Sequence, residues 1–277
     1  MAKHYEETIR QPKKILTPAS GFLKNYTHTL NPYVGCSFAC SYCYVRKSPV
    51  GVFRGQEWGT WVDIKEVSKE KIKREIVNLR KRGKGVTIFM SSSTDPYQPT
   101  EYTQEVTRRL LEGMVEEPPD FLFIQTRSPL ITRDIDLYKQ LKGRFRISMT
   151  IETDQEAVRK RFTPSAPPIQ ARMKALEELK ANQLPIQVAV SPILPFSEQF
   201  PEKLASLVEQ IVLDDYVSGD GSGGRRTELL KVKELYQEDE LNIWYQKELH
   251  KEVLKKMKNA FSEECIYLSQ DGFKPFV

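Results

Sequence analysis

Three of the four cysteines in the chain lie within eight residues, as Cys36, Cys40 and Cys43, in a C-x3-C-x2-C arrangement. Such close spacing indicates a metal site, but the fourth cysteine, Cys265, lies near the other end of the chain. A structural zinc ion takes four protein ligands in a closed tetrahedron. An iron–sulfur cube has four irons, and full ligation by the protein takes four thiolates. Three thiolates would therefore hold a cube by three irons and leave the fourth iron open, which is a feature of catalytic sites.

Disulfides, a zinc site and buried structural cysteines each account less well for this spacing. A disulfide framework is typical of short secreted chains, whereas this chain has four cysteines in 277 residues. A zinc site could recruit His28 or Cys265 as its fourth ligand, although the sequence contains no second C-x2-C pair. Buried structural cysteines would not need so tight a spacing. The spacing therefore favours an iron–sulfur site over a zinc site.

The composition is that of an ordinary globular protein. Hydrophobic residues make up 39% of the chain and charged residues 29%, which is enough apolar material for a sizeable core. We expect no membrane span, because no apolar run reaches about 18 residues. The N-terminus lacks the apolar segment of a secretion signal, so a cytoplasmic location is expected. The net charge of +5 permits nucleic-acid binding without indicating it.

After the cysteines, short apolar runs alternate with longer segments of helical periodicity. Counting one strand before the cysteines, we expect six strands, at 27–34, 86–90, 121–124, 145–150, 186–190 and 211–217. We expect helices at 65–82, 103–115, 134–141, 169–179, 204–211 and 238–260. This alternation indicates an α/β fold of six parallel β/α units. The cysteines directly follow the first strand, at the end where parallel β/α folds bind ligands.

The composition changes near residue 218, where the sequence Ser-Gly-Asp-Gly-Ser-Gly-Gly is typical of a flexible loop. We therefore divide the chain into an N-terminal extension (1–26), a partial barrel (27–217), a Gly/Ser-rich loop (218–228) and a C-terminal part (229–277). Because only about 50 residues follow the loop, we expect the C-terminal part to form a helix and cap packed on the barrel.

The segment 35–44 resembles the signature of the radical S-adenosylmethionine (SAM) superfamily. In that superfamily the three cysteines bind a 4Fe–4S cluster, and the amino and carboxylate groups of SAM chelate the fourth iron. The reduced cluster cleaves SAM to methionine and a 5′-deoxyadenosyl radical, which abstracts a hydrogen atom. The resemblance thus implies a 4Fe–4S cluster and SAM as cofactors. It also implies an open partial (β/α)6 barrel, similar to a TIM barrel, which agrees with the six expected units.

The resemblance further implies contacts to SAM at the strand ends. After the second strand, superfamily members place a Gly-Gly-Glu motif on the SAM amino group. Hydroxyl and carboxylate acceptors stand there in this chain, namely Ser91, Ser92, Ser93, Thr94 and Asp95. After the fourth strand, Ser148, Thr150 and Glu152 share one face and are candidates for the ribose, and Pro192 and Ile193 after the fifth strand are candidates for the adenine. Ordinary turn, strand-end and core positions also account for these residues.

Several segments resemble the spore photoproduct lyase-like branch of the superfamily. They are 94–99 with Glu101, 126–134, the two tyrosines beside the last cysteine, and 164–167 with Arg172. Authentic spore photoproduct lyases use a further cysteine downstream of the cluster to return a hydrogen atom to the product radical. The stretch 45–115 contains no cysteine here, so repair of DNA is an alternative and not the first hypothesis.

Three tyrosines near the expected cluster are candidates for hydrogen-atom relay or for stacking on a base, namely Tyr42, Tyr44 and Tyr97. Packing in the core or at the rim accounts for them equally well. The chain has three histidines, which leaves little scope for histidine general-base catalysis and suits a radical mechanism.

Three hypotheses follow for the function. The first is a radical SAM enzyme acting on an unidentified substrate, for which a nucleic acid is one candidate. The second is a true photoproduct lyase that repairs DNA. The third is a zinc-stabilised nucleic-acid-binding module without catalysis. For the first two, the resemblance implies a flavodoxin- or ferredoxin-type reductant, and the substrate and the oligomeric state stay open.

Overall fold

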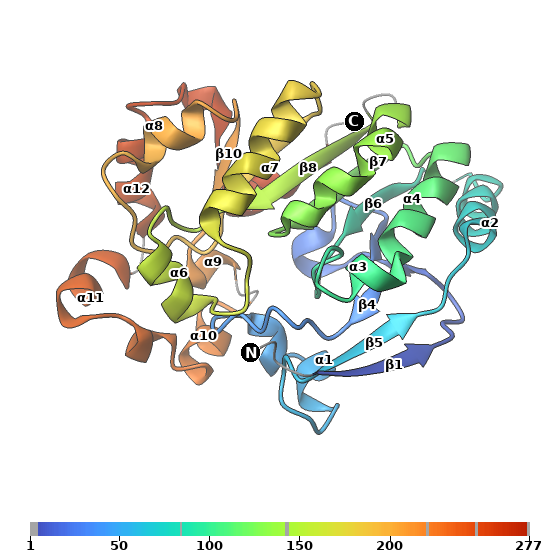
Figure 1. Cartoon of the computed structure of the whole chain (residues 1–277), viewed down its shortest axis with the longest axis horizontal. Coiled ribbons are helices and arrows are strands. Elements are labelled where there is room, and N and C mark those ends of the chain that lie inside the picture. The colour runs from blue at the N-terminus through green and yellow to red at the C-terminus, as the bar shows by residue number, and fades with distance from the viewer. Residues whose placement is uncertain (1–4, 84, 142–143, 220–221, 247–248, 276–277) are drawn as a thin grey trace.

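The computed structural model describes residues 5–83, 85–141, 144–219, 222–246 and 249–275, and its centre is an eight-stranded sheet (Figure 1). The strands follow the order β11-β10-β9-β8-β7-β6-β3-β2. Every pair of neighbours is parallel except β2 and β3, which are antiparallel. The bounds are β2 Leu16–Pro18, β3 His28–Leu30, β6 Thr87–Met90, β7 Phe121–Thr126, β8 Phe145–Thr150, β9 Ile186–Val190, β10 Ile211–Leu213 and β11 Ile266–Leu268.

Six consecutive strands of this sheet, β3 and β6 to β10, are the six that the sequence predicts. The helices that join them lie in succession along the outside of the sheet in Figure 1. They are α2 (Lys69–Arg80), α4 (Val106–Glu116), α5 (Ile135–Gln140), α7 (Ile169–Ala181) and α8 (Phe200–Ala205). The end strands β2 and β11 do not pair with each other in the part of the chain that the structure describes. The prediction of an α/β fold with an open, partial (β/α)6 barrel is therefore confirmed.

The local sequence explains these elements. The four residues of β6 are all buried, as expected for a parallel strand covered on both faces. In α4, Val106, Leu110, Leu111 and Met114 recur at helical spacing and all face the core. The N-terminus of α2 is capped by Ser68, whose side chain accepts a hydrogen bond from the Lys71 amide.

Aromatic side chains fill the interior of the barrel. The rings of Phe89 and Phe123 stack with their centroids 5.0 Å apart, and Tyr26 meets Phe89 edge-on at 5.4 Å. Phe273, from the C-terminal part, lies 6.0 Å from Phe123. Because these rings occupy the interior, the space for a ligand lies above them at the strand ends.

A second, three-stranded sheet of order β1-β5-β4 lies beside the barrel. Its strands are β1 (Glu6–Arg10), β4 (Tyr33–Val34) and β5 (Trp61–Lys65), of which the sequence predicts neither β1 nor β5. Between β4 and β5 the chain forms the cysteine loop, the 3-10 helix η2 (Tyr44–Lys47) and the short helix α1 (Pro49–Val52). The predicted strand 27–34 is thus two strands in different sheets. Pro32 separates them, because proline lacks the N–H donor that a strand ladder needs.

Two predicted helices are each divided in two. The helix expected at 103–115 is α3 (Glu101–Gln104) followed by α4, because Glu105 between them has a left-handed φ of 49°. The helix expected at 238–260 is α11 (Glu238–Trp244) and α12 (Leu249–Met257), and residues 247–248 lie outside the described residues. The last barrel strand is shorter than predicted, because α9 (Tyr216–Gly219) begins three residues after β10 ends.

The N-terminal and C-terminal parts both contribute strands to the main sheet, through β2 and β11. The Gly/Ser-rich segment 218–228 includes the start of α10 (Arg225–Leu229), and residues 220–221 lie outside the described residues. The division into four parts stays a prediction. The remaining elements are η1 (Gly21–Leu23), η3 (Pro129–Asp134), α6 (Glu156–Phe162), η4 (Val232–Leu235), η5 (Glu263–Cys265) and η6 (Ser269–Phe273). In the described ranges, no helix is both long and apolar enough to span a membrane.

Candidate active site

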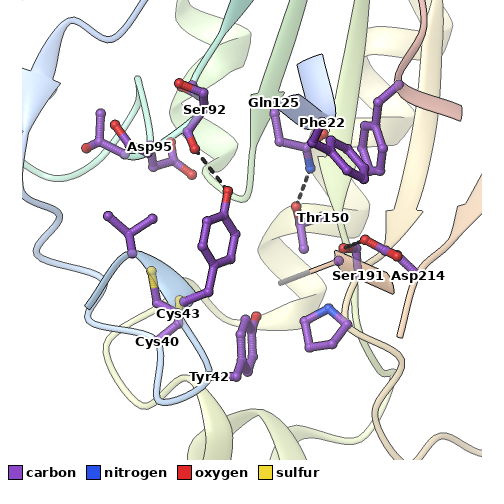
Figure 2. A pocket seen from close by; sticks show the side chains of 18 of the residues that line it. Phe22, Cys40, Tyr42, Cys43, Ser92, Asp95, Gln125, Thr150, Ser191 and Asp214 are labelled. Atoms are coloured by element: carbon purple, nitrogen blue, oxygen red, sulfur yellow. Dashed lines mark hydrogen bonds between the residues drawn. The ribbon is translucent and has the colours of Figure 1, made fainter. Parts of the chain in front are cut away.

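One cavity of about 380 Å³ lies at the carboxyl ends of the barrel strands (Figure 2). Residues at the ends of five strands or just after them line it, at 91–95, 125–127, 150, 191–192 and 214–216. The cysteine loop forms another wall, and Phe22, Phe89 and Phe273 add apolar surface. In Figure 2, Cys40 and Cys43 lie on one side of the cavity, and Ser191 and Asp214 lie on the other. This is the end at which parallel β/α folds bind ligands.

The cysteine loop is fixed to the turn that follows β6. The Gly35 carbonyl accepts a hydrogen bond from Thr94 Oγ1 at 2.6 Å and one from Gln98 Nε2 at 3.2 Å. Gln98 in turn accepts from the Ser37 amide at 2.9 Å. The entry to the loop is tight, because a Cβ atom at Gly35 would lie 2.6 Å from the Trp61 carbonyl oxygen. These contacts hold the two walls of the cavity together.

All three cysteines of the loop line the cavity, and none forms a disulfide. Cys36 and Cys40 are buried and Cys43 is half-buried. Burial raises the pKa of all three thiols, to about 11 for Cys43, and the Arg127 charge opposes this rise at Cys40 and Cys43. Cys265 lies in η5 and does not line the cavity. The described cavity therefore offers three thiols and no fourth.

A buried network of charges supports the last part of the cysteine loop. The Tyr42 hydroxyl donates to Glu152, which also accepts from Arg127 at 2.5 Å and from Arg172 at 2.7 Å. Burial alone would raise the pKa of Glu152, but the two guanidinium groups hold that pKa below its ordinary value. Arg127 also lines the cavity, where the Asp95 carboxyl group lies close enough to feel its charge.

The turn after β6 presents several acceptors to the cavity. Ser91 has a left-handed φ of 85°, and its hydroxyl oxygen is buried without a hydrogen-bond partner. The Ser92 carbonyl accepts from the Tyr44 hydroxyl at 3.2 Å. Asp95 is buried, which raises its pKa, and it accepts from the Tyr97 amide, from Thr126 and from the Arg127 amide. The Asp95 carboxylate thus ties this turn to the end of β7.

The cavity brings together most of the residues singled out in the sequence. They are Cys36, Cys40, Tyr42, Cys43, Tyr44, Ser91, Ser92, Ser93, Thr94, Asp95, Thr150 and Pro192. Glu152 does not line the cavity itself but contacts Tyr42 and Arg127, which do.

Besides Glu152, three of the predicted residues do not line the cavity. Tyr97 is buried behind the turn, where its hydroxyl bonds Asp134 at 2.9 Å and Tyr138 at 2.6 Å. Ser148 is buried and accepts from Gln187 at 3.3 Å. Ile193 is a fully buried core residue. Each of the three therefore has a structural place in the protein interior.

Sequence reasoning missed several polar or charged residues of the cavity, among them Gln125, Arg127, Asp214 and Asp215. Gln125 lies near the end of β7 and the other three follow barrel strands, so their positions at the strand ends were the available signal. Gln125 donates to Thr150 at 2.6 Å, and its carbonyl oxygen is buried without a partner. Burial is the main cause that raises the pKa of Asp214 to about 7. No sequence signal indicated that Phe22 or Phe273, from opposite ends of the chain, would reach the site.

Most of the chain is similar to a known protein family. A family model described as the radical SAM superfamily matches residues 30–211, which span the cysteine loop and nearly all of the barrel. The chain belongs to the radical SAM superfamily. The family inferred from the cysteine spacing is therefore confirmed.

Several relatives of this radical SAM protein are uncharacterized. One, from Methanocaldococcus jannaschii, is 32% identical over 183 residues, which is 66% of each chain. Another, from Acidianus two-tailed virus, is 30% identical over 84% of this chain and 77% of the relative. A third, from Mycobacterium tuberculosis, is 26% identical over 67% of this chain and 55% of the relative. The chain thus spans between 55% and 77% of the length of these relatives.

Solved structures of spore photoproduct lyase share this fold. The complex with dinucleoside spore photoproduct aligns with a TM-score of 0.65 and 12% identity, covering 95% of this chain and 81% of that chain. A variant with bound AdoMet and dinucleoside spore photoproduct aligns with a TM-score of 0.66 and 13% identity over the same shares. At this identity the likeness shows the common fold and leaves the reaction open.

The radical SAM family uses a 4Fe–4S cluster and SAM, and the donor set of the cavity fits them. In a cubane cluster each cysteine ligates a different iron, so the thiols need not converge on one point. In the described residues, no group of three or more His, Cys, Asp or Glu side chains is placed to hold a metal ion. The unpartnered Ser91 and Gln125 oxygens are acceptors that suit the ammonium and hydroxyl donors of SAM.

Proposed function

We propose that this chain holds a 4Fe–4S cluster through Cys36, Cys40 and Cys43 and binds SAM in the adjoining cavity. The observation that carries this proposal is that three thiols line the cavity at the strand ends of a radical SAM barrel. The other cysteine of the described residues, Cys265, lies outside that cavity. When bound, the cluster and SAM supply a 5′-deoxyadenosyl radical by one-electron cleavage of SAM, and that radical abstracts hydrogen from a substrate. The surrounding residues bind, orient and shield the reactants.

The turn after β6 would bind the SAM ammonium group. Ser91, Ser92 and Ser93 line the cavity, and the Ser91 hydroxyl has no hydrogen-bond partner. Asp95 uses both carboxylate oxygens to hold Tyr97, Thr126 and Arg127, so we assign it the task of fixing the turn. Because a buried ammonium group needs acceptors, the unpartnered Ser91 hydroxyl is the better candidate for direct contact.

Residues further along the cavity would hold the nucleoside part of SAM. Gln125 and Thr150 hydrogen bond each other at 2.6 Å, and the free Gln125 carbonyl oxygen can accept from a ribose hydroxyl. Pro192 offers an apolar surface that an adenine ring can cover. These assignments follow the positions of the strand ends around the cavity.

Tyr42 and Tyr44 flank Cys43 and both line the cavity. Their hydroxyls donate to Glu152 and to the Ser92 carbonyl, respectively, so both rings have fixed orientations. We assign them as the candidates for hydrogen-atom relay or for contact with the substrate. Tyr97, which lies behind the turn, would instead support the position of Asp95.

Repair of a DNA photoproduct is a second candidate function. It is supported by the fold shared with spore photoproduct lyase bound to dinucleoside spore photoproduct. Against it, the chain has no cysteine between Cys43 and Cys265. The decisive assay measures reversal of the thymine photoproduct in an irradiated oligonucleotide under conditions in which SAM is cleaved. Cleavage of SAM without reversal would reject this candidate and keep the general proposal.

Two further expectations accompany the proposal. A one-electron donor of the flavodoxin or ferredoxin type must reduce the cluster, because SAM cleavage consumes an electron that the cluster has to regain. A cytoplasmic location would suit free thiols and an oxygen-sensitive cluster.

Anaerobic reconstitution with iron and sulfide tests the proposal. The wild-type protein should bind four irons and four sulfides, turn brown, and form 5′-deoxyadenosine from SAM when dithionite is added. Replacing Cys36, Cys40 and Cys43 together by alanine should abolish the brown colour. The matched variant Cys265→Ala should keep the cluster, because Cys265 lies outside the cavity.

Two results would contradict the proposal. One is stoichiometric zinc without iron in anaerobically purified protein, which would support the non-catalytic zinc module. The other is an intact cluster that forms no 5′-deoxyadenosine from SAM under reducing conditions.

A further inference from the structure

The segment that follows Cys43 is tied to the cysteine loop by hydrogen bonds. Cys43 is the N-cap of η2, and its carbonyl accepts from the Arg46 amide at 3.1 Å. Ser48 then joins η2 to α1, accepting from the Val52 amide at 2.9 Å. The Arg46 guanidinium reaches back to the Ala39 carbonyl, next to Cys40, at 2.5 Å. The backbone from Cys43 to the end of α1 is therefore a continuous hydrogen-bonded unit attached to the loop.

The outer face of this unit exposes large apolar side chains. Val50 is 39% exposed, Val52 56% and Phe53 84%. Seven large hydrophobic residues are exposed in the described part of the chain, and three of them lie within residues 50–53. Phe53 is the most exposed of the seven. Apolar residues scattered singly on a surface need no explanation, but a cluster marks an interaction site.

The charged residues of segment 44–56, which contains this cluster, are all basic. From residue 44 to residue 56 the chain contains Arg46, Lys47 and Arg54 and no acidic residue. Arg54 is balanced by Asp63 at 3.0 Å. Lys47 is exposed and makes no ion pair with any residue that the structure describes. Helix α10, which lies against η2, carries the exposed Arg225 and the exposed Glu228.

We propose that Lys47, Val50, Val52 and Phe53, here called the 47–53 patch, dock an acidic one-electron donor protein that reduces the cluster. This inference rests on the proposed function, which requires one electron to reach the group held by Cys43. The donor loses one electron, the cluster gains it, and no bond forms or breaks at this stage. An acidic protein of the flavodoxin or ferredoxin class fits the patch, because the negative charge of such a donor complements Lys47 and the other basic residues of segment 44–56.

The composition of the patch favours such a protein over a nucleic acid. Binding to nucleic acids depends on many cations that contact phosphates. The 47–53 patch has one unpaired cation and three exposed apolar side chains, which is the pattern of a transient protein interface with an apolar centre and a polar rim. Its backbone connection to Cys43, the least buried of the three cysteines, places the docked donor beside the cluster ligands.

Two reductants applied to the same reconstituted protein test the proposal. Anaerobic stopped-flow absorbance follows reduction of the cluster by reduced flavodoxin and, separately, by dithionite. The double variant Val52→Ser/Phe53→Ser should lower the rate with flavodoxin by about ten-fold or more, and Lys47→Glu should lower it mainly at low ionic strength. The rate with dithionite should not change, because a small reductant needs no docking surface. Ile9→Ser and Tyr102→Ser remove exposed apolar side chains elsewhere and should leave both rates unchanged.

Each other result overturns the proposal in a distinct way. Equal rates with flavodoxin in the wild type and the patch variants would exclude docking at this surface while leaving the cluster intact. Slower reduction by both reagents to the same extent would overturn docking at this surface, because the substitutions would then act on the cluster itself. Weaker binding of an oligonucleotide with unchanged reduction rates would make the patch a nucleic-acid surface. Absence of a cluster in the wild-type protein would overturn the proposed function and this inference with it.

Discussion

The Tyr42 hydroxyl donates a hydrogen bond to the Glu152 carboxylate and so joins the cysteine loop to the end of β8, across 110 positions of sequence. Glu152 is almost fully buried and also accepts hydrogen bonds from Arg127 and Arg172. Four residues from four segments of the chain therefore meet under the cysteine loop. The two guanidinium groups compensate the charge of this buried carboxylate and bond both of its oxygens.

Replacement of the Glu152 carboxylate should destabilise the folded protein. The variant Glu152→Gln keeps the shape of the side chain but leaves the charges of Arg127 and Arg172 uncompensated. We expect the free energy of unfolding to fall by about 3 kcal/mol or more, because a buried ion pair that loses one partner leaves an unpaired charge. Urea unfolding of the protein measures the change. The control Glu252→Gln removes one partner of an exposed ion pair and should leave the free energy of unfolding nearly unchanged.

The barrel strands could be predicted because their signal is local. Each is a short run of buried apolar residues, and each is followed by a helix with its own periodicity. The position of the cysteine loop at the ligand-binding end followed from strand order alone. The same reasoning missed β11, which has three residues, and β5, whose sequence Trp-Val-Asp-Ile-Lys interrupts the apolar run with an aspartate.

The contacts within the charged part of the site could not be predicted, because they join residues far apart in the sequence. In the sequence Arg127 is one basic residue in a polar segment, and only the fold brings it to Glu152 and Tyr42. Likewise, Tyr97 lies close in sequence to the turn that lines the cavity, yet its ring points away to Asp134. Sequence spacing indicates the right strand ends but not the direction in which each side chain points.

Gly35, directly before Cys36, lies where the cysteine loop has no room for a side chain. It combines a left-handed φ of 85° with a close approach, since a Cβ atom would lie 2.6 Å from the Trp61 carbonyl oxygen. The variant Gly35→Ala should lose about 3 kcal/mol of stability or more and retain less iron after reconstitution, because the loop must move. Gly55→Ala is the matched control. Gly55 also has a left-handed φ, of 72°, but open space surrounds it. The Gly55→Ala protein should therefore lose only about 1 kcal/mol of stability and bind as much iron as the wild type.

Similar iron content in the Gly35→Ala and wild-type proteins would contradict this account. It would mean that the cysteine loop can bind its group after moving away from Trp61. Iron analysis and the visible absorbance of the reconstituted proteins distinguish the two outcomes.

Ser91 should show opposite effects on stability and on binding. Its left-handed φ of 85° costs about 1 kcal/mol for a residue with a side chain, and its buried hydroxyl has no partner. The variant Ser91→Gly should therefore unfold at a higher urea concentration. If the hydroxyl accepts a hydrogen bond from SAM, the same variant should bind SAM about ten-fold more weakly. The control is Ser93→Gly. Ser93 does not have a left-handed φ, so its replacement by glycine relieves no strain and should destabilise the protein.

Equilibrium binding of SAM to the reconstituted Ser91→Gly protein supplies the second measurement. Unchanged affinity with raised stability would show that the Ser91 hydroxyl does not contact SAM. Lower stability would show that the left-handed backbone conformation is not a source of strain at this position.

Asp214 should make the stability of the protein depend on pH. Its pKa is raised from 3.8 to about 7, chiefly by burial, so the folded protein keeps a proton that the unfolded chain releases. The stability that this proton contributes is fully present below about pH 4 and is lost as the pH rises through about 7. Urea unfolding at about pH 5 and about pH 8 should therefore show a loss of a few kcal/mol in the wild type. Asp214→Asn cannot ionise and should lose clearly less, whereas the exposed Asp271→Asn should follow the wild type. Parallel pH profiles for the wild type and Asp214→Asn would show that Asp214 is already ionised in the folded protein at low pH.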